Sequence, residues 1–270
     1  MFDRMLLLVG LLVLAHPTHA AWRETDESIK SRGDVTVQIL VARAVAKIGD
    51  EIPNPPNDIA VFFPGADGKV RRARAGLSEH GKNPSTMGLM AEKFGMAVAF
   101  GLPSDQPDGI SVSWRIGAEH IGDASAVIDW LVKQYPVARI TMIGMSNGGR
   151  SVTRVAEAIV KRGAPKLHGV VVMSAAPEAI AEGIMSPIRE AKVPVLVMHH
   201  KRDSCLLYRD IEPVAKRYTF VAIDDTKQPM VSLFMRSCSP GSAHVFGGKE
   251  ALVYSIIAEW VQTGKVSAVD

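Results

Sequence analysis

The sequence has few of the features that assign a function from composition alone. Its 270 residues include only two cysteines, too few for a disulfide-scaffolded mini-protein or a four-thiolate zinc site. The formal net charge is only +3, so the chain lacks the basic surplus that is typical of nucleic-acid-binding proteins. Aromatic residues make up 6%, but hydrophobic residues make up 47%, which excludes a disordered chain. We therefore expect a folded protein of one large or two small domains that binds no nucleic acid.

Long hydrophobic runs are also lacking. The apolar run at residues 5–15 (MLLLVGLLVLA) is too short to cross a bilayer core of ~30 Å, and no later run reaches the ~18 residues of a membrane span. Arg4 precedes the run, and Thr18 and Ala20 supply the small residues that signal peptidase reads. The pattern predicts a signal peptide over residues 1–20, with an uncleaved anchor as the alternative. We therefore expect an exported protein, periplasmic or secreted, without stable membrane insertion.

Export also bears on whether the two cysteines form a disulfide bond. In an oxidising compartment Cys205 and Cys238 most simply form one disulfide bond, and two buried free thiols are the alternative. The bridge would close a loop of about 34 residues. In the chain-entropy model, such a loop stabilises the fold by roughly 3–4 kcal/mol.

Short β-branched runs bounded by glycine or proline alternate with amphipathic segments along the whole mature chain. This alternation predicts an α/β fold with a doubly wound, mostly parallel sheet, in a single domain over residues 21–270. The Pro- and Asn-rich segment 51–58 lies between two predicted strands and is interpreted as a hairpin loop. We expect strands at residues 35–46, 58–63, 96–100, 140–144, 169–173 and 193–199, and helices at 118–135, 147–162 and 251–262.

The strongest local motif is Gly144-Met145-Ser146-Asn147-Gly148, between a predicted buried strand and a predicted helix. A serine in this context must lie on a very tight turn, and glycines two before and two after it avoid a collision between Cβ and the neighbouring backbone. The turn lifts the hydroxyl clear of the sheet. It also leaves the Asn147 N–H directed at any oxyanion that forms there. The alternative is a glycine-rich turn with an incidental serine.

This motif and its context resemble the nucleophile turn of the α/β-hydrolase family, and the resemblance covers about residues 35–261. In that family an acid follows a later strand and a histidine follows the last one, in the chain order Ser, Asp, His. Asp203 follows the strand VPVLVMH by four residues, and His244 precedes the last predicted helix. The resemblance therefore implies a catalytic triad of Ser146, His244 and Asp203, which cleaves carboxylic esters through an acyl-enzyme and needs no metal or cofactor.

The chemistry of these residue types supports the same assignment. A serine hydroxyl is a poor nucleophile at neutral pH and needs a base with a pKa near 7, which imidazole supplies. The imidazole in turn needs a carboxylate that fixes its tautomer and stabilises the imidazolium. Asp224 or Asp225, at the end of a strand-like segment, is the alternative acid. A metal site at His199 and His200 is a weaker alternative, and we interpret His199 as strand-end packing.

The resemblance also places a second oxyanion donor in the loop at residues 64–68, where the backbone N–H of Ala66 joins that of Asn147. The family often has a histidine where this chain has Pro64, so the position of that donor is less well fixed. Met145, Trp114 and His200 are candidates for lining the substrate pocket. A Cys205–Cys238 bridge would tie the loop of the acid to the loop of the histidine.

The segment at residues 175–192 has room for one helix, where hydrolases often insert a lid. We therefore expect a lidless esterase, similar to dienelactone hydrolases, that acts on a small-molecule acyl substrate. An acyltransferase that uses the same triad, or a binding module that has lost catalysis, is the alternative. The sequence does not distinguish ester, thioester, lactone and peptide substrates, and it does not give the oligomeric state.

Overall fold

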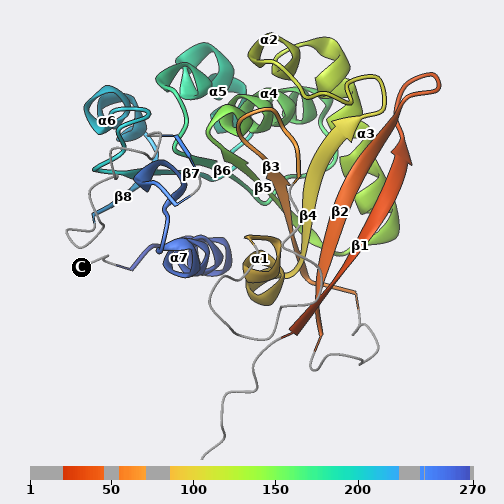
Figure 1. Cartoon of the computed structure of the whole chain (residues 1–270), viewed down its shortest axis with the longest axis horizontal. Coiled ribbons are helices and arrows are strands. Elements are labelled where there is room, and N and C mark those ends of the chain that lie inside the picture. The colour runs from red at the N-terminus through yellow and green to blue at the C-terminus, as the bar shows by residue number, and fades with distance from the viewer. Residues whose placement is uncertain (1–20, 46–54, 71–85, 225–237, 240, 268–270) are drawn as a thin grey trace, which may run out of the picture.

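The computed structural model describes residues 21–45, 55–70, 86–224, 238–239 and 241–267. They build an eight-stranded sheet in the order β1-β2-β4-β3-β5-β6-β7-β8 (Figure 1). β2 runs antiparallel to both β1 and β4, and all other neighbours are parallel. The predicted α/β class with a mostly parallel sheet is thus confirmed. The strands are β1 Ala21–Lys30, β2 Thr36–Val45, β3 Asp58–Phe63, β4 Gly95–Pro103, β5 Arg139–Met145, β6 Gly169–Met173, β7 Val195–His200 and β8 Thr219–Ile223.

Helices cover both faces of the sheet, as Figure 1 shows. α1 (Thr86–Phe94) and α7 (Glu250–Thr263) pack on one face. The other face carries α3 (Ala118–Gln134), α4 (Asn147–Arg162), α5 (Glu182–Glu190) and α6 (Tyr208–Ala215). The remaining helical elements are short: α2 Val112–Arg115, η1 Pro177–Ile180 and η2 Ala243–Val245.

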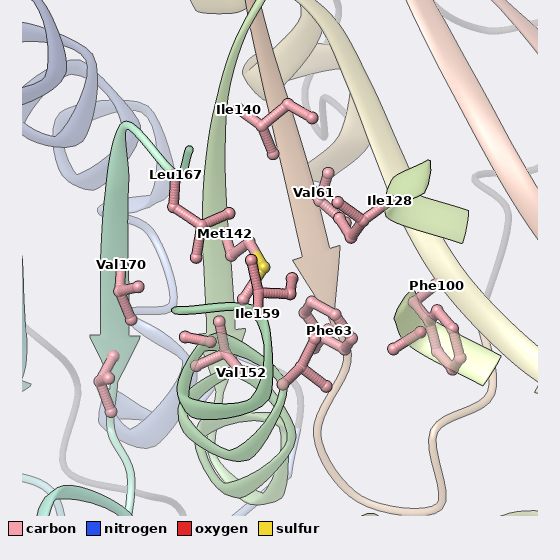
Figure 2. Packing of buried hydrophobic residues seen from close by; sticks show 14 of the residues in the cluster. Val61, Phe63, Phe100, Ile128, Ile140, Met142, Val152, Ile159, Leu167 and Val170 are labelled. Atoms are coloured by element: carbon pink, nitrogen blue, oxygen red, sulfur yellow. The ribbon is translucent and has the colours of Figure 1, made fainter. Parts of the chain in front are cut away.

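The strand β5, which leads into the candidate site, is buried on both sides. Met142 packs in the core beneath α4, with Val152 of that helix and Phe63 of β3 (Figure 2). Ile143 and Met145 belong to the opposite core, beneath α1 and α7. Successive side chains of a strand point to opposite faces, so a strand covered on both faces must be apolar throughout. This is why ITMIG was recognisable as a central parallel strand.

The predicted elements agree with the observed ones to within three residues at each end. β8 coincides with the strand-like segment before Asp224, whereas β1, with the sequence AWRETDESIK at the edge of the sheet, was not predicted. Its charged residues do not suggest a buried strand, but all ten residues pair with β2. Charged side chains are common on edge strands because they discourage pairing with other chains.

The hairpin expected at residues 51–58 is wrong. β2 and β3 are not neighbours, because β4 lies between them and pairs with both. Two consecutive strands in the sequence suggested a hairpin, but β4 occupies the position between them in the sheet, so β2 and β3 do not pair with each other. Most of this connection lies outside the described residues.

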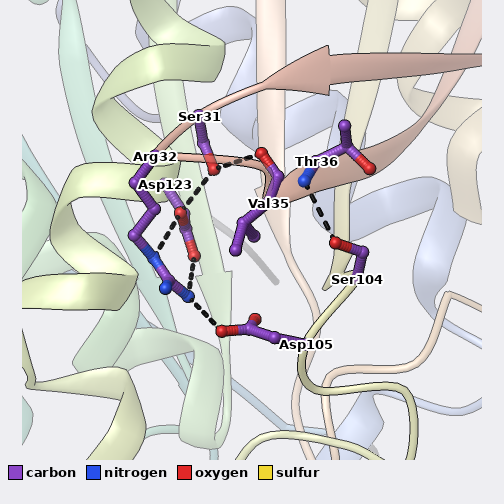
Figure 3. Close-up of polar contacts among 7 residues, drawn as sticks. All are labelled: Ser31, Arg32, Val35, Thr36, Ser104, Asp105 and Asp123. Atoms are coloured by element: carbon purple, nitrogen blue, oxygen red, sulfur yellow. Dashed lines mark hydrogen bonds and ion pairs between the residues drawn. The ribbon is translucent and has the colours of Figure 1, made fainter.

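A polar network fixes the turn between β1 and β2 against α3 (Figure 3). Asp123 of α3 is completely buried and accepts hydrogen bonds from Ser31 Oγ (2.6 Å) and Arg32 Nε (3.0 Å). Arg32 Nη2 also donates to Asp105 Oδ2 at 2.8 Å. A buried carboxylate that is paired and hydrogen-bonded in this way anchors the edge of the sheet to the helix layer.

The connection between β6 and β7 contains only η1 and the nine-residue α5. No lid is inserted there, as predicted. The predicted signal peptide, residues 1–20, lies outside the described residues. Among the helices that the structure describes, none is both long and apolar enough to span a bilayer.

Candidate active site

Ser146 occupies the tight turn between β5 and α4, with φ 53° and ψ −121°. A non-glycine residue at such a φ is strained and is held there by its surroundings. A Cβ on Gly144 would lie 2.3 Å from Gly148 O, and a Cβ on Gly148 would lie 2.0 Å from Phe63 O. The two glycines of the motif therefore let β5, α4 and the end of β3 approach closely. The half-buried hydroxyl lies at the carboxyl end of the parallel strands, where α/β proteins bind ligands.

Asp203 lies in the loop that follows β7 and is buried. Its Oδ2 is 2.8 Å from His244 Nδ1, and its Oδ1 accepts hydrogen bonds from the backbone N–H groups of Cys205 (2.8 Å) and Leu206 (3.0 Å). Burial raises the pKa of Asp203, but His244 and these N–H groups outweigh it and hold the pKa below its ordinary value. Asp203 is therefore an ionised carboxylate aimed at the imidazole.

His244 lies in η2, just before α7, and is buried. With Nδ1 engaged by Asp203, its Nε2 is the nitrogen left to act as a base, and Nε2 has no hydrogen-bond partner among the described residues. His244 and Ser146 line the same cavity. The structure contains no hydrogen bond between Ser146 Oγ and His244 Nε2; such bonds often tighten only when substrate is bound.

The loop after β3 passes close to Ser146. A Cβ on Gly65 would lie 3.0 Å from both Met145 O and Ser146 Cβ, so this loop and the serine turn are in contact. Ala66 has a left-handed φ of 46° and lines the cavity. Its carbonyl oxygen accepts a hydrogen bond from Asn147 Nδ2 at 3.4 Å. The Asn147 N–H is among the first of α4 and lacks an acceptor within the helix.

The sequence did not identify Arg115, which holds this loop from behind. Arg115 lies at the end of α2, is 1% exposed, and its Nη2 is 3.2 Å from both Gly65 O and Ala66 O. Its Nη1 donates to Ser151 Oγ of α4 at 3.0 Å. An arginine after Trp114 in a short helix carries no sequence signal for this role, because its contacts are about 50 residues before it and 36 after it.

A cavity of about 630 Å³ opens over Ser146, which is a size typical of small-molecule sites. Met145 lines it, as predicted. Its other described lining residues include Phe62, Pro64, Ala66, Thr86, Met87, Ala99, Asn147, Arg150, Leu206, His244 and Val245.

The other two predicted lining residues lie elsewhere. Trp114 is not among the described residues that line the cavity; it lies beneath Arg32, whose guanidinium carbon is 5.4 Å from the ring centre. Trp114 therefore packs against the network at the β1–β2 turn. His200 is completely buried beside Phe246, and its Nδ1 accepts the backbone N–H of Arg202 at 3.0 Å. The prediction for Trp114 rested on its position in the chain alone, and that for His200 on its place in the loop before Asp203.

The alternative acids are not favoured. Asp224 is 44% exposed and pairs with Lys201 at 3.1 Å, whereas Asp203 already occupies His244 Nδ1. Asp225 lies outside the described residues. The ligating atoms of Asp203, Cys205 and His244 lie within 4.8 Å of one another. However, the sulfur of Cys205 is bridged and is not a thiolate, so this group fits a triad better than a metal site.

His199 packs at the end of β7 behind the acid. It is completely buried, with Nε2 2.8 Å from Leu206 O and 3.4 Å from Asp203 Oδ2. Burial lowers the pKa of His199, so the ring is neutral and its Nε2–H donates to Leu206 O. His199 therefore supports the loop that carries Asp203.

The structure contains a Cys205–Cys238 disulfide bond, with a Cα–Cα distance of 5.0 Å. Both cysteines line the cavity. Cys205 is joined through its own N–H to Asp203, and Cys238 lies six residues before His244. The bridge thus links the chain segment of the acid to the segment that leads to the histidine.

Comparisons with known proteins give matches by structure only. No family model matches the chain, and no curated protein matches it. An esterase of Pyrococcus furiosus is similar over 89% of this chain and 92% of its own, with a TM-score of 0.56 and 15% identity. A protein of Butyrivibrio proteoclasticus solved with ferulic acid bound is similar over 87% and 98%, with a TM-score of 0.54 and 17% identity.

A serine hydrolase of Xanthomonas campestris that lacks a lid is similar over 92% of this chain and 97% of its own, with a TM-score of 0.54 and 14% identity. At such identities the likeness establishes the fold and not the activity. The likeness shows that the chain has the α/β-hydrolase fold, and the short connection between β6 and β7 carries no lid.

Proposed function

We propose that this protein is a serine hydrolase that cleaves carboxylic esters of small substrates through an acyl-enzyme. One observation carries the proposal: His244, oriented by a buried and ionised Asp203 at 2.8 Å, lines the same cavity as the strained Ser146. A base oriented by a carboxylate, beside a serine that is lifted from the sheet, is the arrangement that nucleophilic acyl transfer requires.

In the first half-reaction His244 Nε2 removes the proton from Ser146 Oγ as that oxygen attacks the ester carbonyl carbon. The carbonyl oxygen becomes an oxyanion, which accepts hydrogen bonds from the N–H groups of Asn147 and Ala66. Asp203 stabilises the imidazolium. His244 then gives its proton to the leaving alcohol oxygen, the C–O bond breaks, and the acyl group stays on Ser146. Water, deprotonated by His244, then attacks the acyl carbon; the bond to Ser146 Oγ breaks, His244 returns the proton to Oγ, and the acid is released.

The cavity supports small acyl or aryl groups as substrates. Its lining is partly apolar, with Phe62, Met87, Leu206 and Val245 around the reacting centre, and among the described residues the β6–β7 connection inserts no lid over it. The ferulic acid in the Butyrivibrio neighbour and the esterase identity of the Pyrococcus neighbour support testing aryl and alkyl esters together.

The test is hydrolysis of p-nitrophenyl butyrate and methyl ferulate by the wild type and by Ser146→Ala. We expect Ser146→Ala to lose on the order of 10⁴–10⁶ in kcat. Ser174→Ala is the matched control, because Ser174 also follows a central strand at positive φ (42°) but is not among the described residues that line the cavity. Hydrolysis that survives in Ser146→Ala would overturn the proposal.

A fluorophosphonate probe, followed by mass spectrometry of the labelled peptide, checks the acyl-enzyme directly. We expect one adduct, on Ser146, and none in Ser146→Ala. Adding an alcohol acceptor to the ester assay distinguishes hydrolysis from acyl transfer, because a transferase would form the new ester faster than the free acid.

We also propose that the protein is exported, with residues 1–20 removed. The disulfide bond supports this, because such bonds persist in oxidising compartments. The intact mass of the protein recovered from outside the cytoplasm should correspond to a chain that begins at Ala21, and a mass that retains Met1 would contradict the prediction.

A further inference from the structure

Arg115 is a charged side chain buried among neutral groups. Its guanidinium contacts three uncharged oxygens, from Gly65, Ala66 and Ser151, and no carboxylate of the described residues forms an ion pair with it. Burial lowers the pKa of Arg115 to about 10, while the charge of Asp67 opposes that change, so the group remains a cation at neutral pH. A buried cation without an ion-pair partner is unfavourable for folding, and such groups are frequent at functional sites.

The contacts of Arg115 determine where one N–H group points. In a trans peptide the C=O and N–H bonds point in opposite directions. The Gly65 carbonyl faces the buried guanidinium, so the N–H of the same peptide unit, that of Ala66, points away from Arg115. That N–H donates to no other group of the described residues, and Ala66 lines the cavity over Ser146.

The hydrogen bonds of Arg115 also hold Ala66 in its strained backbone conformation. Ala66 has a left-handed φ of 46°, which an alanine adopts only when its surroundings hold it there. Arg115 Nη2 binds the carbonyl on each side of that residue, and Gly68 N–H adds a hydrogen bond to Gly65 O at 2.9 Å. Gly68 itself must stay small, because a Cβ there would lie 2.8 Å from Ile110 and 3.2 Å from Arg115 Nη2.

We propose that Arg115 is a positioning residue for the oxyanion site, which turns the Gly65–Ala66 peptide so that the Ala66 N–H faces the reacting carbonyl oxygen. Its positive charge, behind that peptide in a region with little water, also favours the negative oxygen of the transition state over the neutral ester. Arg115 acts through the peptide and does not touch the substrate. This inference rests on the proposed esterase function.

The test compares Arg115→Met with the wild type on p-nitrophenyl butyrate. Methionine fills similar space but donates no hydrogen bond and carries no charge. Loss of an oxyanion donor costs ~10²–10³ in rate, so its misorientation should lower kcat roughly 10- to 100-fold and leave KM within about threefold. Arg154→Met is the matched control, because Arg154 of α4 pairs with Glu157 and does not contact the loop; its kcat should equal that of the wild type.

A second measurement separates this role from a merely structural one. A trifluoromethyl ketone adds Ser146 Oγ to its carbonyl carbon and leaves an oxyanion in the site, so its Ki reports the oxyanion interaction. We expect the Ki to rise in Arg115→Met by the same factor as kcat falls. An unchanged Ki and kcat in a folded Arg115→Met would overturn the inference, and so would a loss of kcat with an unchanged Ki.

Arg115→Lys covers the case in which Arg115→Met does not fold. A lysine keeps the charge, but its compact ammonium does not reproduce the planar fork that reaches three oxygens. We expect a loss of kcat that is smaller than in Arg115→Met but clear, and wild-type kcat and Ki in Arg115→Lys would overturn the inference. A wild type that neither hydrolyses esters nor binds the ketone would instead overturn the proposed function itself.

Discussion

Replacing Gly148 with alanine has two effects of opposite sign on the stability of the fold: a gain in helix propensity and a steric overlap. Gly148 lies in the first turn of α4, where the helix propensity of alanine is better than that of glycine by about 1 kcal/mol. However, the new Cβ would lie 2.0 Å from Phe63 O and 2.8 Å from Phe63 C, whereas real Cβ contacts are not shorter than 3.0 Å. The end of β3 must therefore move by about 1 Å relative to α4, and such overpacking typically costs 1–3 kcal/mol.

The steric term equals or exceeds the propensity term, so we expect net destabilisation of up to about 2 kcal/mol. At roughly 2–4 °C per kcal/mol for a chain of this size, Tm should fall by up to about 8 °C. The effect on activity should be larger. Phe63 O directly precedes the loop that carries Ala66, and a displacement of about 1 Å in a catalytic group can cost ~10² in rate. We therefore expect kcat for p-nitrophenyl butyrate to fall about 100-fold.

Gly122→Ala supplies the control, because Gly122 lies inside α3 and a Cβ there would meet nothing within 4 Å. Only the propensity term operates at that position, so Tm should rise by about 2–4 °C with unchanged kcat. Thermal unfolding followed by circular dichroism and ester hydrolysis measures both variants. A Gly148→Ala protein with the Tm and kcat of the wild type would show that the loop after β3 does not depend on this close approach.

Three further predictions follow from the same site and its surroundings. Asp203→Asn should lower kcat ~10⁴-fold while far-UV circular dichroism stays unchanged, because the amide favours the wrong tautomer of His244. The double variant Cys205→Ala/Cys238→Ala should lose roughly 3–4 kcal/mol in urea unfolding and part of its kcat; full retention of both would refute the structural role of the bridge. His120 is buried, and this burial, together with the charge of Arg115, lowers its pKa to about 3. Below pH ~6.5 the unfolded chain therefore binds a proton that the folded chain does not. The free energy of unfolding then falls by up to ~1.4 kcal/mol for each pH unit toward acid. His120→Leu should make the slope shallower by that amount between pH 6.5 and 4, as measured by urea midpoints at each pH, while the buried His199 keeps its own contribution.

The serine turn was predictable because everything it needs is local in sequence. Gly144 and Gly148 flank Ser146 by two residues, and the strand and helix on either side have unambiguous patterns. The partners Asp203 and His244 are distant in sequence, and spacing alone does not bring them together. Their assignment came from the resemblance to the α/β-hydrolase family, whose chain order is Ser, Asp, His; parallel strands present their following loops at one edge of the sheet, which is why a chain order can correspond to a common position.

The structure differs from the sequence-based expectation where a residue's position is decided by packing far from the motif. Trp114 was expected in the pocket on its position in the chain alone, but its ring packs against the guanidinium of Arg32 at the β1–β2 turn. The turn joins β2 to β1, a charged segment without a strand pattern that nevertheless pairs along the whole of β2. Because β1 was not predicted, the contact between Arg32 and Trp114 at its turn was not foreseen either.

Arg115 and Trp114 are adjacent in sequence, yet the structure gives them different partners for one physical reason. The short helix α2 directs the indole toward the β1–β2 turn and the guanidinium inward, where the carbonyl groups of Gly65 and Ala66 and the hydroxyl of Ser151 need donors. Every residue has a backbone carbonyl, so the residue types of the loop do not predict which donor will bind these oxygens. Reactive side chains can be found in a sequence because their chemistry depends on residue type. Residues that orient the backbone are harder to find, because their role depends on where the fold leaves a polar atom without a partner.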